Sequence, residues 1–307
     1  MSEPLKDILA EENVAPNARV TSVCEAIAAR HPDRVQAFMY YGSSLRDLDD
    51  AEKMLDFYVV VDSYRKTHKN PIRALLNRLI PPAVYYYEQT DENGVLSTCK
   101  YSIISIAEFE KRCSDQALLS MVWGRFCQPS VMLFPKDKLV SERLMASRET
   151  AVRHMAAQIA PLIDQPVSST AFWAKGFYES YRTELRPESS EGRAAEIVAR
   201  YDERYARLTT ALYGSPDKDG FYIIPNKSSR QTQAKAKWFL RRLLGKPMTA
   251  IRVINSAATF EGGLDYVLRK LKNHSGVTID PSPFQRKHPV ICSPVLGWKL
   301  WRKGAFN

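Results

Sequence analysis

The sequence predicts a mixed α/β (α+β) fold, in which a small mixed sheet with helices is followed by a helical domain and a basic C-terminal region. Two short runs rich in β-branched and aromatic residues, 35–41 and 55–61, indicate strands. The second is expected to be buried on both faces because it is almost entirely apolar. The stretch 108–213 has mainly helical character. We therefore expect three parts, at 1–112, 113–215 and 216–307.

Local signals predict the remaining elements. Residues 1–35 read as mainly helical, and the charged stretch 45–54 between the two strands is expected to be a helix. A basic helix over 64–79 ends before Pro81-Pro82, because proline lacks the N–H group that a helix needs. An Asn93-Gly94 turn separates two further strands, and a linker rich in Gly and Asp follows the helical domain. These strands and the linker are expected at 83–88, 100–106 and 214–220.

Charge is unevenly distributed along the chain, which has a net charge of +10 from 44 Lys/Arg and 34 Asp/Glu. Residues 221–307 carry 16 Lys/Arg and 3 Asp/Glu, a net of +13, whereas the remainder, with 28 basic and 31 acidic residues, has −3. Such asymmetry indicates an anionic partner for the C-terminal part, either a membrane surface or nucleic acid.

Cysteine usage and hydropathy indicate a reducing, cytoplasmic setting. The five cysteines are scattered and form no Cys-x-x-Cys pair, so neither zinc nor a disulfide framework is supported. No apolar run approaches the roughly 18–20 residues that cross a bilayer. The first residues resemble neither a secretory signal nor a transit peptide. We expect a cytoplasmic protein without a targeting peptide or a transmembrane segment.

The turn Tyr41-Gly42-Ser43-Ser44, followed by Asp56 on the next strand, has the outline of a nucleotidyltransferase site. Gly42 lets the chain turn closely past phosphate oxygens, and Ser43 stands at the start of a helix, where free N–H groups attract anions. Asp56 would hold Mg²⁺. Many such enzymes have a second acid two residues later, where this chain has Tyr58. The alternative is an ordinary β-turn followed by a core strand with Asp near its start.

Several stretches match, in order, a set of motifs. The turn at 41–44 is similar to Tyr-Gly-Ser-Gly, and 54–57 is similar to a Met-Leu-Asp-Phe strand that also carries an apolar residue where Tyr58 stands. In this order they resemble the mitochondrial-type (translocator assembly and maintenance) phosphatidate cytidylyltransferases, also called CDP-diacylglycerol synthases. The match covers roughly 36–215 and departs at Ser44, Thr183 and Glu184. Its other stretches lie at 84–86, 100–105, 123–129 and 180–186.

The resemblance implies a nucleotidyltransferase-type sheet, followed by a helical domain of which a winged helix is one form. It also implies that CTP and phosphatidate give CDP-diacylglycerol and pyrophosphate, with the nucleotide at 41–44 and Mg²⁺ on Asp56. Lys100 and Arg125 are the further catalytic candidates, as contacts to phosphate. A solvent-facing lysine and an arginine in a structural salt bridge are the plain alternatives. Lower-ranked candidates for the substrate phosphate are Asp62, His68, Tyr181, Glu184 and Arg186.

The basic tail has the composition of an interfacial membrane anchor. Residues 227–246 carry seven Lys/Arg and no acid, interleaved with aromatic and aliphatic residues. The alternatives are that the apolar residues pack on the protein core and, with less support, that the tail binds RNA. The residues expected to contact an anionic membrane are Lys237, Trp238, Phe239, Arg241, Arg242, Trp298 and Trp301.

These observations favour a cytidylyltransferase that is peripherally associated with the cytoplasmic face of a membrane and uses CTP, phosphatidate and Mg²⁺. One alternative is a nucleotidyltransferase that acts on RNA or protein. Another is a non-catalytic membrane- or RNA-binding protein on the same scaffold, which stays open because Asp56 is the single clear acid of the motif. We do not expect nucleic acid as the partner, and the sequence indicates no protein partner.

Overall fold

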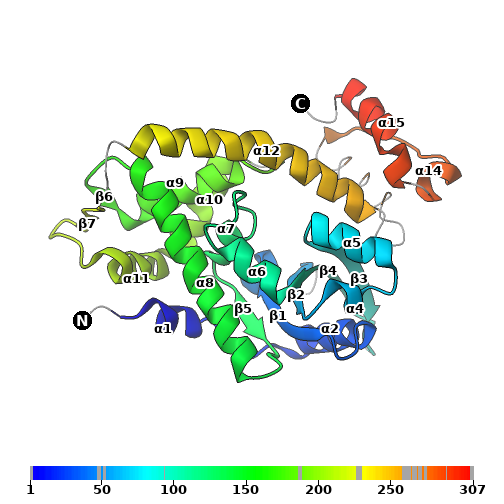
Figure 1. Ribbon diagram of the computed structural model, residues 1–307, viewed down its shortest axis with the longest axis horizontal. Helices are drawn as coiled ribbons and strands as arrows, with labels where there is room; N and C mark the ends of the chain where they lie inside the picture. The colour runs from blue at the N-terminus through cyan, green and yellow to red at the C-terminus, as the bar shows by residue number, and fades with distance from the viewer. Residues whose placement is uncertain are drawn as a thin grey trace.

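The computed structural model describes residues 3–46, 50, 53–92, 94–185, 189–225, 230–257, 264, 268, 272, 275–287 and 289–304. A five-stranded mixed sheet with the order β3-β4-β2-β1-β5 lies at one end of the molecule, with helices around it (Figure 1). The predicted mixed α/β class is confirmed. The strands are β1 (Val35–Tyr41), β2 (Leu55–Val61), β3 (Ala83–Thr90), β4 (Leu96–Ser105) and β5 (Val131–Leu133).

The register of the sheet brings distant candidate residues together. β1 and β2 are antiparallel, and Tyr41 pairs with Asp56. β2 and β4 are parallel, and Asp56 pairs with Lys100. Gly42 directly follows the last residue of β1. The turn, the strand carboxylate and the lysine therefore meet at one end of the central strands.

The helix predicted at 45–54 is wrong in its C-terminal part. The observed helix α3 (Ser43–Arg46) is a single turn, and neither Lys53 nor Met54 is helical. Residues 47–49, 51 and 52 lie outside the described part of the chain.

The single helix predicted at 64–79 is two helices, α4 (Tyr64–Thr67) and α5 (Pro71–Leu79). Pro71 has no N–H group to continue the ladder from α4, so it occupies the first turn of a new helix. Asn70 caps this helix, and its side chain accepts a hydrogen bond from the N–H of Ile72 at 2.9 Å. The short strand β5 was not predicted, because three residues carry too little alternation to be recognised in the sequence.

Both faces of the sheet are covered, and alternate side chains enter different cores. Phe38 and Phe57 point into a core with helix α2 (Ala18–Arg30). Met39 and Tyr58 point into a larger core shared with the helical part of the chain. This larger core crosses the expected boundary at residue 112 and includes helix α1 (Leu5–Ala10).

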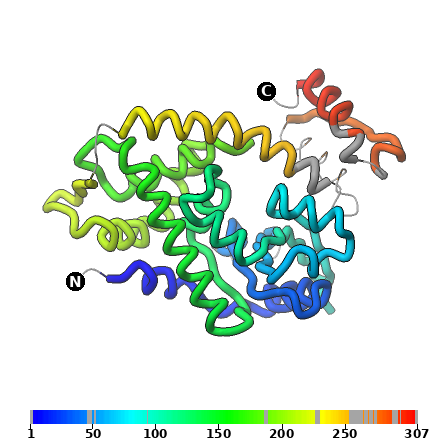
Figure 2. Tube along the Cα trace, viewed as in Figure 1, coloured from blue at the N-terminus to red at the C-terminus, as the bar shows by residue number. Residues whose placement is uncertain are grey.

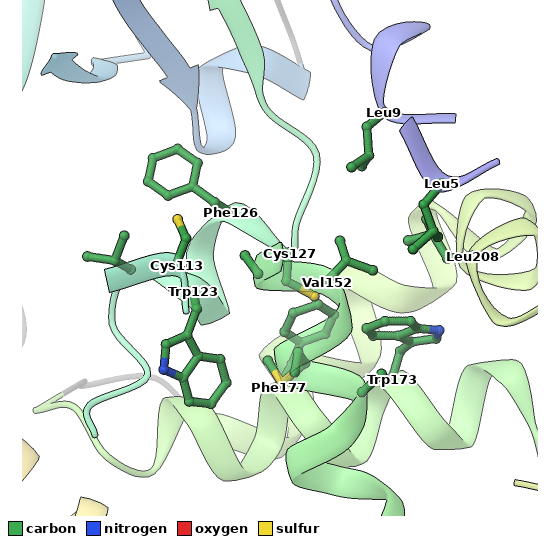
Figure 3. Packing of buried hydrophobic residues seen from close by; sticks show 14 of the residues in the cluster. Leu5, Leu9, Cys113, Trp123, Phe126, Cys127, Val152, Trp173, Phe177 and Leu208 are labelled. Carbon is green, nitrogen blue, oxygen red and sulfur yellow. The ribbon is translucent and has the colours of Figure 1, made fainter. Parts of the chain in front are cut away.

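Short helix α7 (Trp123–Phe126) lies where the sheet meets the helical part. In Figure 3, Phe126 lies near the sheet, whereas Trp123 and Cys127 point among the helices that carry Val152 and Phe177. All five side chains are buried. The surrounding helices are α6 (Ile106–Cys113), α8 (Lys138–Ile159), α9 (Ser169–Tyr181), α10 (Ser190–Arg200) and α11 (Asp202–Tyr213), with the 3₁₀ turn Ala160–Leu162 and the strand pair β6 (Val167–Ser168) and β7 (Phe221–Tyr222).

The basic C-terminal part begins with the long helix α12 (Gln231–Ala257), which runs along the upper edge of the molecule in Figure 1. Helices α14 (Pro283–Lys287) and α15 (Pro289–Arg302) follow. Leu296 and Leu300 of α15 pack with Leu264 and Leu268 in a small separate cluster. In the described part of the chain, no helix is both long enough and apolar enough to cross a membrane.

Candidate functional site

A pocket of about 170 Å³ opens where the end of β1 faces the helical part of the chain. The sheet side contributes the turn after β1 and the carboxylate of β2. The helical side contributes α7, the segment after it, the end of α9 and one residue of α10. The lining residues are Tyr41, Gly42, Ser43, Asp56, Gly124, Arg125, Gln128, Pro129, Ser180, Tyr181, Glu184 and Arg193.

Gly42 is the position of this turn that no other residue can fill without strain. Its φ of +98° lies in a region that L-residues avoid. A Cβ atom at this position would lie 2.9 Å from Oδ2 of Asp56 and 3.3 Å from its Cβ. The absence of a side chain therefore lets the turn backbone lie directly against the carboxylate. Ser43 lines the pocket, whereas Ser44 is buried outside it, so the side chain of Ser44 is not available to a nucleotide.

Asp56 and Lys100 form an ion pair between neighbouring parallel strands, with Nζ of Lys100 3.6 Å from Oδ1 of Asp56. Both side chains remain partly exposed. Lys100 is thus paired and partly exposed, but it is not among the residues that line the pocket. Its ammonium group lies beside a carboxylate of the pocket lining, so its positive charge acts next to the pocket.

Arg125 supplies positive charge to the opposite wall, which also includes Arg193. Its guanidinium carbon lies 4.8 Å from the centre of the Tyr41 ring, in cation–π geometry. The negative charges of Glu184 and Asp56 are near enough to act on it. Gly124 permits this placement, because a Cβ there would lie 2.5 Å from Oγ of Ser180. Helix α7 can approach α9 closely only with glycine at that point.

A chain of hydrogen bonds fixes the floor of the pocket. The hydroxyl of Tyr181 donates to Oε1 of Gln128 at 3.2 Å, and Nε2 of Gln128 donates to the carbonyl of Gly124 at 3.0 Å. Tyr181 and Glu184, which the sequence placed among low-ranked phosphate contacts, both line the pocket. Arg186, from the same stretch, lies outside the described residues.

Some lining residues were missed by the sequence analysis. Gln128, Pro129 and Ser180 lie inside stretches that carry the resemblance, so proximity to Arg125 and Tyr181 was an available signal. Arg193 had no such signal, because it lies outside these stretches, and an arginine three residues before a glutamate is typical of a solvated helix face. In the structure Arg193 does pair with Glu196, at 2.7 Å.

The structure does not bring Asp62 and His68 into the pocket. Asp62 follows the far end of β2 and pairs with Arg34 at 2.9 Å. His68 is buried beside α5, with Nε2 2.9 Å from Nδ2 of Asn77 and Nδ1 3.3 Å from the hydroxyl of Tyr85. Burial lowers the pKa of His68 to about 4, so the ring is neutral at physiological pH. Asp62 and His68 therefore make structural contacts away from the pocket.

Two of the residues expected at a membrane lie in the protein interior instead, and a third is partly exposed but paired with another helix. Trp238 is 1% exposed, and its Nε1 donates to the carbonyl of Gln158 at 3.1 Å. Arg241 is buried against the Trp238 ring, and burial lowers its pKa to about 10. Arg242 pairs with Glu179 of α9 at 2.8 Å. These residues attach α12 to the helical part, because one helix face must cover the core.

The other expected membrane residues are exposed. Lys237 and Phe239 lie on the outer face of α12, and Trp298 and Trp301 on α15. Leu240, Leu243 and Leu244 extend the outer face of α12, so this helix is apolar on two sides.

The carboxylates of the pocket suit a Mg²⁺ ion that is shared with a substrate, rather than one held by protein ligands alone. Among the described residues no group of three His, Cys, Asp or Glu is placed to hold a metal ion. Asp56 and Glu184 nevertheless line the same pocket with carboxylate oxygens. Mg²⁺ is usually held by one or two carboxylates together with substrate phosphates and water, so these donors suit an ion that arrives with a nucleotide.

Comparison with known proteins adds no family: no family model matches the chain, and no curated protein matches it in sequence.

Proposed function

We propose that this protein is a phosphatidate cytidylyltransferase, which joins CTP and phosphatidate to give CDP-diacylglycerol and pyrophosphate. The observation that carries the proposal is the convergence of Gly42, Asp56, Arg125, Tyr181 and Glu184 in one pocket. These residues come from separate stretches of the sequence, and their shared position in one pocket supports the proposal. The pocket combines a close-turning backbone, carboxylates and a guanidinium, which a triphosphate with a divalent ion requires.

In the proposed reaction, an unprotonated phosphate oxygen of phosphatidate attacks the α-phosphorus of CTP. A new P–O bond forms, and the bond from the α-phosphorus to the bridging oxygen breaks and leaves its electron pair on pyrophosphate. The turn at Gly42 and Ser43 positions the outer phosphates, and Arg125 and Lys100 offset negative charge. Asp56, with Glu184, would hold Mg²⁺, which supplies charge stabilisation to the phosphates when bound.

Peripheral association with a membrane belongs to the same proposal. Phosphatidate is a bilayer lipid, and the outer face of α12 places Phe239, Leu240 and Leu243 in solvent. Lys237 and Lys246 are exposed on the same helix. Apolar residues with flanking lysines suit the interface of an anionic membrane.

The test is pyrophosphate release by the purified chain with each of the four nucleoside triphosphates, with and without phosphatidate and Mg²⁺. We expect turnover only with CTP, phosphatidate and Mg²⁺ together. Asp56→Asn should lower it by about a hundredfold or more, because the pocket loses a charged metal ligand.

Asp62→Asn is the matched control, since Asp62 belongs to the same strand region but lies outside the pocket. It should leave turnover unchanged. Full activity of the Asp56→Asn variant would refute the assignment, and turnover with ATP and RNA would assign a different acceptor.

A further inference from the structure

Helix α5 (Pro71–Leu79) carries its apolar residues on the outside. Ile72, Leu75, Leu76 and Leu79 are 66%, 55%, 36% and 65% exposed. Their spacing of i, i+3, i+4 and i+7 places all four on one stripe of the helix. A helix of a globular protein normally turns such a stripe towards the core, so the orientation of α5 is reversed.

The inner face of α5 is held by small and polar contacts instead. Ala74 and Asn77 are its buried residues. Oδ1 of Asn77 accepts from the backbone N–H of Ala83 at 2.7 Å, and Nδ2 lies 2.9 Å from Nε2 of His68. These bonds fix α5 to the start of β3 and leave the apolar stripe outside. The stripe therefore does not serve the packing of this domain.

The chain segment that carries the stripe is basic. Residues 63–87 contain five Lys/Arg and no Asp or Glu. At 100° per residue, Arg73 and Arg78 lie about 110° to either side of the centre of the stripe. All five basic side chains are exposed; they are Arg65, Lys66, Lys69, Arg73 and Arg78.

We propose that α5 is an interfacial helix that lays its apolar stripe on an anionic lipid bilayer. In this orientation Arg73 and Arg78 extend sideways to lipid phosphates while their stems remain against the apolar zone. Charge selects this occupant, because a second copy docked through the same face would bring five cations against five. The described residues of α14 and α15 do not cover the stripe, since its side chains remain exposed.

This inference deepens the membrane part of the proposed function and does not depend on the nucleotide or the reaction. It adds a second membrane contact, on the sheet domain, to the membrane contact proposed for α12. Arg252 of α12 donates to the carbonyl of Pro81 at 3.0 Å, so the C-terminal half of α12 is joined to the chain just after α5. Figure 2 shows α5 below this end of α12. The residues that bear on the membrane are therefore not confined to the tail.

The experiment is flotation of the full chain with vesicles of phosphatidylcholine alone or mixed with phosphatidylglycerol. The wild-type protein should float with the acidic vesicles. Leu75→Gln with Leu79→Gln should weaken partitioning about tenfold or more, because two apolar side chains no longer leave water. Arg73→Gln with Arg78→Gln should weaken it by about fivefold per arginine on acidic vesicles only.

Leu139→Gln is the matched control, because Leu139 is equally exposed, at 64%, but lies on α8. It should float as the wild type does. The proposal is overturned if the α5 variants float like the wild type, or if the wild type does not bind acidic vesicles. It is also overturned if the wild type binds mixed RNA more tightly than acidic vesicles. Turnover with detergent-dispersed phosphatidate, measured in parallel, tests the proposed function separately. If the protein is active and its α5 variants still float, only the interfacial role of α5 is refuted.

Discussion

Replacing Gly42 by alanine tests how the pocket is assembled, because one methyl group perturbs two things at once. The φ of +98° costs an L-residue about 1–2 kcal/mol. The new Cβ would also lie 2.9 Å from Oδ2 and 3.3 Å from Cβ of Asp56, closer than an ordinary van der Waals contact of 3.4–4 Å. The carboxylate of Asp56 must therefore shift, and with it the ligand proposed for Mg²⁺.

The backbone cost and the carboxylate shift are separable with a control. Gly214 has a similar φ of +91°, but nothing lies within 4 Å of a Cβ built there. Gly42→Ala and Gly214→Ala should both lose about 1–2 kcal/mol of unfolding free energy in denaturant titrations. Only Gly42→Ala should lose CTP-dependent pyrophosphate release, by about ten- to a hundredfold, because the ligand is misplaced by a fraction of an ångström.

Two outcomes would refute this reasoning. If Gly42→Ala keeps full turnover, contact between the turn and Asp56 does not matter to the reaction. If Gly214→Ala loses as much turnover as Gly42→Ala, the loss reflects general instability and not the position of the carboxylate. Isothermal titration of CTP in the presence of Mg²⁺ would show whether the Gly42→Ala defect lies in nucleotide binding.

Two further predictions concern stability. Glu12 accepts hydrogen bonds from the buried guanidinium groups of Arg148 and Arg204. Glu12→Gln should therefore lower the unfolding free energy by about 3–5 kcal/mol in denaturant titrations. A loss of unfolding free energy below about 1 kcal/mol would contradict a buried ion cluster. Burial alone would raise the pKa of Glu12, but the two arginines lower it below the usual 4.5. The contribution of ionised Glu12 to the unfolding free energy is therefore present at neutral pH and is lost only as pH falls below 4.5. Burial lowers the pKa of His68 from 6.5 to about 4, and that of His154 likewise. The unfolded chain therefore binds more protons in this interval, and the unfolding free energy should fall by about 2 kcal/mol per histidine between pH 6.5 and pH 4. His68→Gln should flatten this pH profile by about half, and a wild-type profile that is already flat would be inconsistent with neutral buried rings.

The central strands were predictable because their signal is local. β1 and β2 have the expected bounds, since runs of β-branched and aromatic residues ending at a Gly-Ser turn leave few alternatives. The single helix expected at 64–79 was wrong, although Asn70-Pro71 is a local start signal that was available. β5 was beyond prediction, because three residues become a strand only through pairing with β1.

The candidate site was partly predictable for the same reason. Gly42 and Asp56 were found because a turn and a strand carboxylate are close in sequence. Arg193 was missed, because it joins the pocket through the packing of α10 on α9. Arg241 was misread as a membrane residue, because hydropathy does not tell which side of an amphipathic helix meets protein.

The sequence by itself determined the class of the fold, the central strands and the placement of Gly42 just after β1, because these depend on neighbouring residues and backbone preference. Only the tertiary structure decided which distant charges share the pocket and which face of each basic helix remains in water. The reason is long-range packing. Trp238 and Arg241 point inward because the helical part offers them hydrogen-bond acceptors on Gln158. Ile72 and Leu79 stay outside because Asn77 holds the opposite face of α5 to the sheet domain.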